Sequence, residues 1–171
     1  MEQALIEFYY QFHINQHYFL CHDILEEAWK AQPRYSKEDD VVSLILFSTA
    51  CYHYRRGNTV GAKRSAQKAL SIINLFDKEV HLGLKLEEYR SEIQQLIFNI
   101  ERKQPFEPVH LPLTEDMVCL IIKHYPDFTF NVEPAVDSYI INHHLERDRT
   151  EVHRARHYAL MERQQNRQNN K

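Results

Sequence analysis

Two apolar segments with helical spacing constrain the fold of this chain more than any other feature of its sequence. Residues 18–30 read YFLCHDILEEAWK, and residues 41–62 read VVSLILFSTACYHYRRGNTVGA. In both, apolar residues recur every three or four positions, which is the period of an α-helix. Polar groups inside such helices cost free energy unless they are paired or used. The two segments therefore predict packed helices and also indicate where a site should be sought.

Helical spacing continues over much of the first hundred residues. We expect helices over residues 2–14, 18–31, from the acidic stretch after Ser36 to 56, from 58 through 76, and over 84–101. Three glycines and six prolines, against ten tyrosines and nine phenylalanines, leave few turns and many side chains for helix packing. The sequence predicts an all-α fold with a compact bundle of about five helices.

Short polar motifs predict where two of these helices begin. Ser36, followed by Glu38, Asp39 and Asp40, is expected to cap the third helix, because carboxylates favour the positive end of a helix. Gly57 can take the left-handed conformation that ends a helix, and Asn58 can cap the next. Arg-Gly-Asn, with Gly61 after it, therefore predicts a tight structural turn.

The composition changes at residue 103. Pro105, Pro108 and Pro112 punctuate the stretch that follows, and the short apolar run 117–122 after Thr114 favours one further helix. A long charged helix is expected from about 135 to 164, followed by a frayed polar tail. We therefore expect a helical bundle over residues 1–103 and a linker with a charged C-terminal helix over 104–171.

The net charge and the cysteines indicate in which compartment the protein works and which partners it does not bind. The net charge of −3 gives no overall attraction to nucleic acid or anionic lipid, and no apolar run approaches the roughly 20 residues of a membrane span. Cys21, Cys51 and Cys119 are odd in number and lie in apolar stretches, which fits buried, reduced thiols. We expect a cytoplasmic protein that binds neither membrane nor nucleic acid.

Five side chains of the two opening segments form a candidate pocket. At about 100° per residue, His22 and Trp29 lie on the core flank of their helix, and Glu26 lies at its boundary. His53 falls within the apolar stripe of the next helix, where we expect it to be buried, and Arg56 follows one turn later. If these flanks face one another, all five converge into one polar cluster between the second and third helices.

Two interpretations of this cluster remain open. In a binding or scaffolding module, it fixes helix register or holds a small anionic ligand at Arg56. In a small, metal-dependent hydrolase, Glu26 acts as a base, or joins His22 and His53 around a divalent transition metal. The zinc motif HExxH is absent, because Glu26 occupies the position of its second histidine. We prefer the binding module, and whether the protein is an enzyme stays open.

The charged C-terminal helix carries a second group of histidines, which are His143, His144, His153 and His157. His153 and His157 have a spacing that suits a metal, but arginines and carboxylates alternate around them, which is typical of a solvated helix with internal ion pairs. The stretch 143–157 holds four arginines and three carboxylates and is mildly basic, whereas the rest of the chain is acidic. We expect this helix to engage a protein partner, its own bundle or a second copy of the chain.

The segments YFLCHDILEEAWK and ACYHYRRGNTVGAKR resemble the family called domain of unknown function 309, small bacterial and archaeal all-helical proteins. The family pattern matches at Tyr18, Phe19, His22, Leu25, Glu26, Trp29, His53, Arg56, Gly57, Asn58, Gly61 and Ala62. Asp23 stands where the family usually has Glu, and Leu20 where an acid is frequent, which weakens a carboxylate-rich metal site. The resemblance covers roughly the first hundred residues, and the remainder resembles the longer bacilli-type members. The resemblance implies a helical fold, and it does not indicate which activity the protein has.

Overall fold

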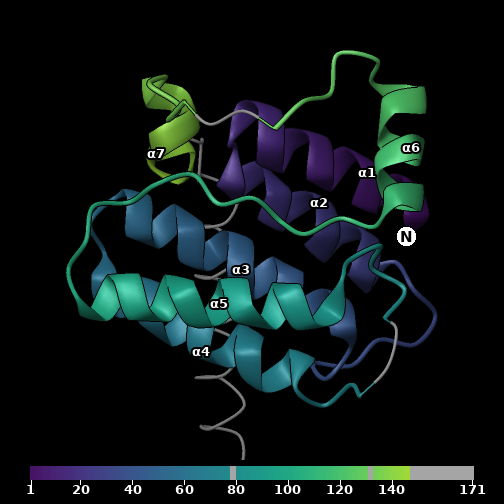
Figure 1. The fold of residues 1–171 in the computed structure, drawn as a ribbon, viewed down its shortest axis with the longest axis horizontal. Helices are drawn as coiled ribbons and strands as arrows, with labels where there is room; N and C mark the ends of the chain where they lie inside the picture. The colour runs from purple at the N-terminus through teal and green to yellow at the C-terminus, as the bar shows by residue number, and fades with distance from the viewer. Residues whose placement is uncertain (78–79, 131–132, 147–171) are drawn as a thin grey trace, which may run out of the picture.

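The computed structural model describes residues 1–77, 80–130 and 133–146. Within these ranges the chain is helical, and its only β-type pairing is an isolated bridge between Leu84 and Leu113 (Figure 1). The elements are α1 (Glu2–Tyr10), the π-helical turn η1 (Gln11–Asn15), α2 (Tyr18–Lys30), α3 (Asp40–Arg55), α4 (Thr59–Ile73), α5 (Leu86–Glu101), α6 (Glu115–His124) and α7 (Ser138–Glu146). The predicted all-α fold is confirmed.

Helix α3 lies at the centre of the bundle. Figure 1 shows it between α2 and the pair α4 and α5, and most of its residues are buried. Ala62, Ala66 and Ala69 of α4 are fully buried, and such small side chains allow two helices to approach closely. Ser43 of α3 uses this proximity, because its hydroxyl donates a 2.9 Å hydrogen bond to the Ala69 carbonyl.

The two predicted caps differ in outcome. Asn58 caps α4 as expected, since its side chain accepts a hydrogen bond from the Gly61 N–H, and Gly57 is left-handed with φ of 74°. Ser36 does not cap α3. Its hydroxyl accepts from the Glu38 N–H in a local turn, and α3 begins only at Asp40.

The first helix departs from the predicted α-helix over residues 2–14. It changes at Gln11 into a wider π-helical turn, closed by Gln16 in the left-handed conformation with φ of 50°. The wider turn places Phe12 and His13, which are adjacent in sequence, in the protein interior together. Such π-turns inside helices are frequent at functional sites, and periodicity does not reveal them.

The chain after residue 103 packs back on the bundle. Leu111, Met117 and Phe128 are buried in the same hydrophobic core as the helices of the first half. The helix predicted around residues 117–122 is present as α6, and the Thr114 hydroxyl caps it by accepting from the Met117 N–H. The predicted division at residue 103, into a bundle and a linker with a charged C-terminal helix, remains a prediction.

The backbone conformation and the close packing at position 83 both require glycine. Its φ is 68°, and a Cβ atom there would lie 2.4 Å from the Met117 Cε atom. Glycine therefore allows the loop before α5 to pass close to α6. In the same place the Thr114 N–H donates to the Gly83 carbonyl at 2.9 Å, which joins the two segments.

Two further expectations need correction. Cys21 and Cys51 are buried as predicted, but Cys119 is exposed, because Met117 and Ile121 turn towards the core and Cys119 between them points away. The predicted helix from residue 135 begins at Ser138 and is interrupted by a non-helical backbone at position 142. Its continuation from 147 to 164 lies outside the described residues. None of the helices in the described part is both long and apolar enough to cross a membrane.

Candidate functional site

His22 and His53 line the same pocket between α2 and α3. The pocket has a volume of about 110 Å³. Its lining residues are Tyr18, Phe19, His22, Thr49, Tyr52 and His53. They recur at helical spacing on both helices, so that each helix presents one face to the pocket. The two sequence segments that were singled out separately therefore contribute to one small, mostly aromatic cavity.

The turn after α3 determines which nitrogen of the neutral His53 ring carries the proton. The Asn58 Oδ1 atom accepts from the Gly61 N–H at 3.0 Å, which leaves the Asn58 Nδ2 amide to donate to His53 Nδ1 at 3.2 Å. Neutral His53 then carries its proton on Nε2. A Cβ atom at position 61 would lie 2.7 Å from Asn58 Nδ2, so Gly61 leaves the space for this amide.

His53 is half-buried rather than buried. Burial, and secondarily the nearby Arg56 charge, lower the pKa of the His53 imidazole below its ordinary value. The ring is therefore neutral at neutral pH and presents one N–H donor at Nε2. The Asn-x-x-Gly motif thus does more than form a turn, because it selects which ring nitrogen of His53 is a donor.

His22 is oriented by its neighbour Asp23. The His22 Nδ1 atom lies 3.1 Å from Asp23 Oδ1, and since a carboxylate only accepts, Nδ1 carries the proton. The Nε2 atom remains as the second ring nitrogen. The Phe19 ring stacks on His22 at a centroid distance of 6.2 Å. Asp23 is not among the five residues of the predicted pocket, although its contact with the neighbouring side chain is enough to hold the His22 ring.

Glu26 and Trp29 lie away from this pocket. The Glu26 carboxylate pairs with Lys30 Nζ at 2.9 Å, one helical turn later, and lines a separate surface hollow. The Trp29 Nε1–H donates to Asp39 Oδ2 at 2.8 Å, and its ring packs against Tyr35. Trp29 therefore ties the end of α2 to the loop before α3 and does not cover the histidines.

Arg56 lies beside the pocket wall. Its guanidinium is 5.3 Å from the centre of the Tyr52 ring, and its Nε–H donates to Asn142 Oδ1 at 3.1 Å. The adjacent Arg55 turns inward instead, where its guanidinium lies 4.7 Å from the Tyr18 ring centre and burial lowers its pKa. Arg55 was missed, although it follows the buried Cys51 by four positions and so shares its helix face.

Residues 133–143 dock next to the pocket through main-chain hydrogen bonds. The Gln16 side chain donates to the Glu133 carbonyl at 2.7 Å and accepts from the Ala135 N–H at 2.9 Å. Arg55 bridges the two segments, because it donates to the Gln16 carbonyl at 2.6 Å and to the Ile140 carbonyl at 3.0 Å. Gln16 is not among the residues that the sequence singles out, since its partners lie more than a hundred residues away along the chain.

A pair of histidines completes this docking. His17 Nε2 lies 2.8 Å from His143 Nδ1, and the Tyr139 hydroxyl lies 3.1 Å from His143 Nε2. The His143 ring also contacts the Phe19 ring of the pocket at 5.1 Å. Burial, together with the neighbouring His143 and Arg55, lowers the pKa of His17 to about 4. His17 is therefore neutral at neutral pH in this contact.

The same side chains include several residues that can act as metal ligands. Within residues 1–77, 80–130 and 133–146, no three His, Cys, Asp or Glu side chains gather closely enough to hold a metal ion. His22, Glu26 and His53 accordingly do not form such a group. His153 and His157 lie outside the described residues, as does the side chain of His144.

Comparison with known proteins places this arrangement in a family. The family model described as "Domain of unknown function (DUF309)" matches residues 5–65, which include every residue of the pocket and the turn after α3. The uncharacterized protein YpuF of Bacillus subtilis strain 168 is 31% identical over 170 residues, covering 96% of this chain and 98% of that protein. No solved structure matches the chain. The chain belongs to the DUF309 family of all-helical proteins of unknown function.

Proposed function

We propose that this protein is a binding module whose α2–α3 pocket holds a small carboxylate with an apolar body. The observation that carries the proposal is that His22 and His53, from two separate motif segments, line one pocket with the Tyr18, Phe19 and Tyr52 rings. Mostly apolar walls with a few placed polar groups are the usual composition of small-molecule sites.

The pocket volume limits the part of the ligand that is enclosed. At about 110 Å³ it is somewhat smaller than an engineered apolar cavity of roughly 150 Å³ that binds benzene. The enclosed group is therefore an aromatic ring or a short branched chain. Larger ligands must leave the remainder of their structure outside the pocket.

The polar groups favour an acceptor with negative charge. His53 offers its Nε2–H donor, and the Arg56 guanidinium lies next to both His53 and Tyr52. A carboxylate near these groups gains a hydrogen bond from the imidazole and attraction from the guanidinium. The neutral form of His53 is useful here, because its single donor needs no proton uptake at neutral pH.

The hydrolase alternative is less well supported by this geometry. Glu26, its expected base, pairs with Lys30 and does not line the pocket of the two histidines. Binding requires only the groups that are present at the cavity. We further propose that the protein works in the cytoplasm, which the free buried thiols of Cys21 and Cys51 support.

The proposal is tested by titrating the ¹⁵N-labelled full-length protein with benzoate and, separately, with benzyl alcohol. The two probes share a ring of suitable size, but only benzoate carries the charge. We expect benzoate to shift the amide signals of residues 18–22 and 49–53, and benzyl alcohol to do so more weakly. Benzoate shifts confined to other residues, or equal affinity for both probes, would contradict the proposal.

A pocket-filling variant provides the matched control. Thr49→Leu adds side-chain volume at the pocket wall and should abolish the benzoate response. Ser71→Leu makes the same kind of change on exposed α4 and should leave the response intact. If Thr49→Leu binds benzoate as the unmodified chain does, the ligand does not occupy this pocket.

A further inference from the structure

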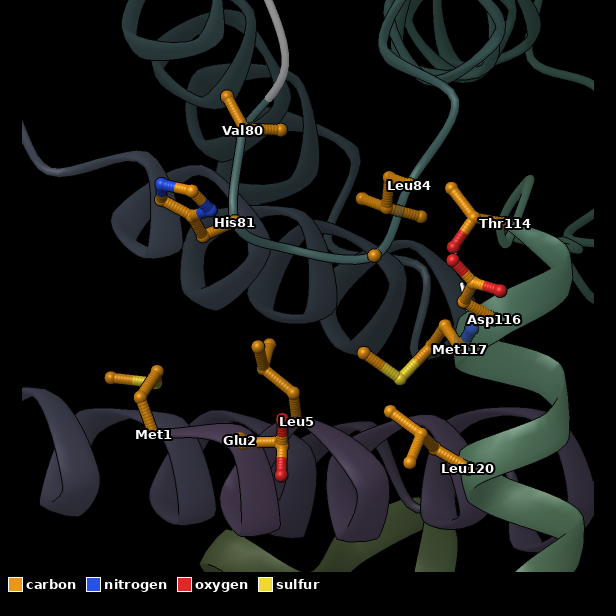
Figure 2. A pocket seen from close by; sticks show the side chains of 11 residues that line it. Met1, Glu2, Leu5, Val80, His81, Leu84, Thr114, Asp116, Met117 and Leu120 are labelled. Atoms are coloured by element: carbon orange, nitrogen blue, oxygen red, sulfur yellow. Dashed lines mark hydrogen bonds between the residues drawn. The ribbon is translucent and has the colours of Figure 1, made fainter.

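A second hollow lies at the beginning of α1, apart from the histidine pocket. Figure 2 shows it between α1, α6 and the loop before α5, and its volume is about 490 Å³. A neighbouring hollow of about 570 Å³ continues it towards the start of α3, and Met1 and His81 line both. We call the two together the N-terminal groove. Each of the two hollows falls within the roughly 300–1,000 Å³ that is usual for binding pockets.

The floor of the N-terminal groove is apolar. Leu5 of α1, Leu84 of the loop, and Met117 and Leu120 of α6 surround the hollow in Figure 2. They come from three segments that are far apart in sequence. The hollow above this floor offers apolar contacts to a side chain that enters it.

The rim of the N-terminal groove is acidic. Glu2 and Asp116 line its first part, and Glu38, Asp39 and Asp40 line its second. No lysine or arginine of the described residues lines either part. Three helix beginnings meet here, and each contributes about half a positive charge, which only partly offsets five carboxylates. The groove therefore favours a basic occupant with apolar side chains.

The sequence of this chain contains a segment of that chemistry. Residues 154–163, outside the described part, read RARHYALMER, with Arg154, Arg156 and Arg163 on either side of the apolar stretch 158–161. Residues 147–171 hold seven basic and three acidic side chains, a net charge of +4. Since the whole chain carries −3, residues 1–146 carry −7, and the two parts attract one another.

We propose that the N-terminal groove of one copy binds residues 154–163 of a second copy. The apolar stretch 158–161 lies on the floor, and the arginines face the rim carboxylates. Two copies that exchange this segment bury two equivalent contacts and form a closed, symmetric dimer. This proposal does not depend on what the histidine pocket binds.

The described chain ends away from the groove. Helix α7, its last element, packs on α2 near the end of α1–η1 that is opposite to Glu2 (Figure 1). Residues 2–15 span about 20 Å along their axis, and a segment of the same chain would have to run back over this whole length. The groove of a neighbouring molecule has no such constraint.

The test is sedimentation velocity of the full-length protein over a range of concentrations, at low and at high salt. We expect a dimer that dissociates as salt is raised, because the contact is between opposite charges. The double variant Glu2→Arg/Asp116→Arg reverses the rim, and Arg156→Asp/Arg163→Asp reverses the segment. Each should weaken the dimer by at least about tenfold, since like charges then face one another.

Sedimentation of a mixture of the two double variants is the most specific part of the test. The groove of the segment variant and the segment of the rim variant are both unmodified, so the mixture should recover a heterodimer. Glu27→Arg, an exposed acid of α2, serves as the control and should leave the dimer unchanged. A protein that is monomeric at every concentration overturns the proposal, and so does a dimer that withstands both double variants.

Discussion

The contact between α3 and α4 and the docking of residues 133–143 are held together by different chemistry. The first buries alanines such as Ala66 and Ala69 against an apolar helix, so that the hydrophobic effect stabilises it. The second relies on Gln16, Arg55 and the His17–His143 pair, whose hydrogen bonds replace equally good bonds to water. The scaffold should therefore be stable, whereas the docked segment should open at low cost.

The histidine pocket lies between these two regions. Thr49 and Tyr52 come from the rigid helix α3, while Phe19 is also touched by His143 of the docked segment. A ligand in the pocket is thus held on one side by the scaffold and meets, on another, a segment that can move away. Variants of the scaffold should therefore change the stability of the whole protein, whereas variants of the docked segment should change only its own exchange with solvent.

The largest effect should follow from damage to the scaffold. Phe47 of α3 is fully buried between Phe12 and Tyr89, so Phe47→Ala should lower the free energy of unfolding by about 3–5 kcal/mol. Urea unfolding measures this change. Phe98→Ala, at an exposed position of α5, is the control and should cost far less. Equal losses in both variants would contradict the central position assigned to α3.

Acid should destabilise the whole protein through His13. Burial lowers the pKa of His13 to about 3, whereas the unfolded chain binds the proton near 6.5. Stability is therefore fully present above about pH 6.5 and falls as pH drops towards 3, by up to about 1.4 kcal/mol per pH unit. Unfolding measured between pH 7 and 4 tests this, and His13→Phe should flatten the slope. An unchanged slope in that variant would assign the acid sensitivity to other groups.

A smaller effect is expected at the turn that joins scaffold and pocket. Asn58→Ala removes the cap of α4 and should cost about 1 kcal/mol in thermal or urea unfolding. Asn58→Asp keeps an acceptor for the Gly61 N–H but would draw the His53 proton to Nδ1. It should therefore nearly preserve stability while weakening benzoate binding. If both variants bind benzoate equally well, the His53 tautomer does not matter for the site.

The smallest global effect should come from the docked segment. Gln16→Ala removes both main-chain contacts to residues 133–135, yet we expect the melting temperature to change little. Hydrogen exchange at residues 133–143 should become faster at the same time. Faster exchange throughout α3 and α4 as well would show that the segment and the scaffold unfold together.

Local chemistry made much of the fold predictable from the sequence. Apolar periodicity located α2, α3 and α4, and Gly57 and Asn58 marked the turn between the last two, because these signals act between residues close in sequence. The π-turn η1 was not predictable, since it depends on the core that receives Phe12 and His13. The helical run nevertheless ends at Asn15, one residue beyond the predicted end.

The candidate site was predictable only in part for a related reason. Helical angles placed His22 and His53 each on the flank of its own helix but left open whether the two flanks face one another. In the structure both histidines line the pocket. The partners of Trp29 and Arg56 could not be predicted, because Asp39 and Asn142 reach them through loops and through a segment far along the chain. The Glu26–Lys30 pair is the exception, since its spacing of four residues was visible in the sequence.

The most direct test of the account is a ¹⁵N–¹H correlation spectrum of the histidine side chains, recorded at neutral pH without and with benzoate. We expect His53 to be neutral with its proton on Nε2, and benzoate to shift the signal of this nitrogen. A proton on His53 Nδ1 in the free protein, with no response to benzoate, would contradict the claim that the turn after α3 prepares this ring to bind a carboxylate.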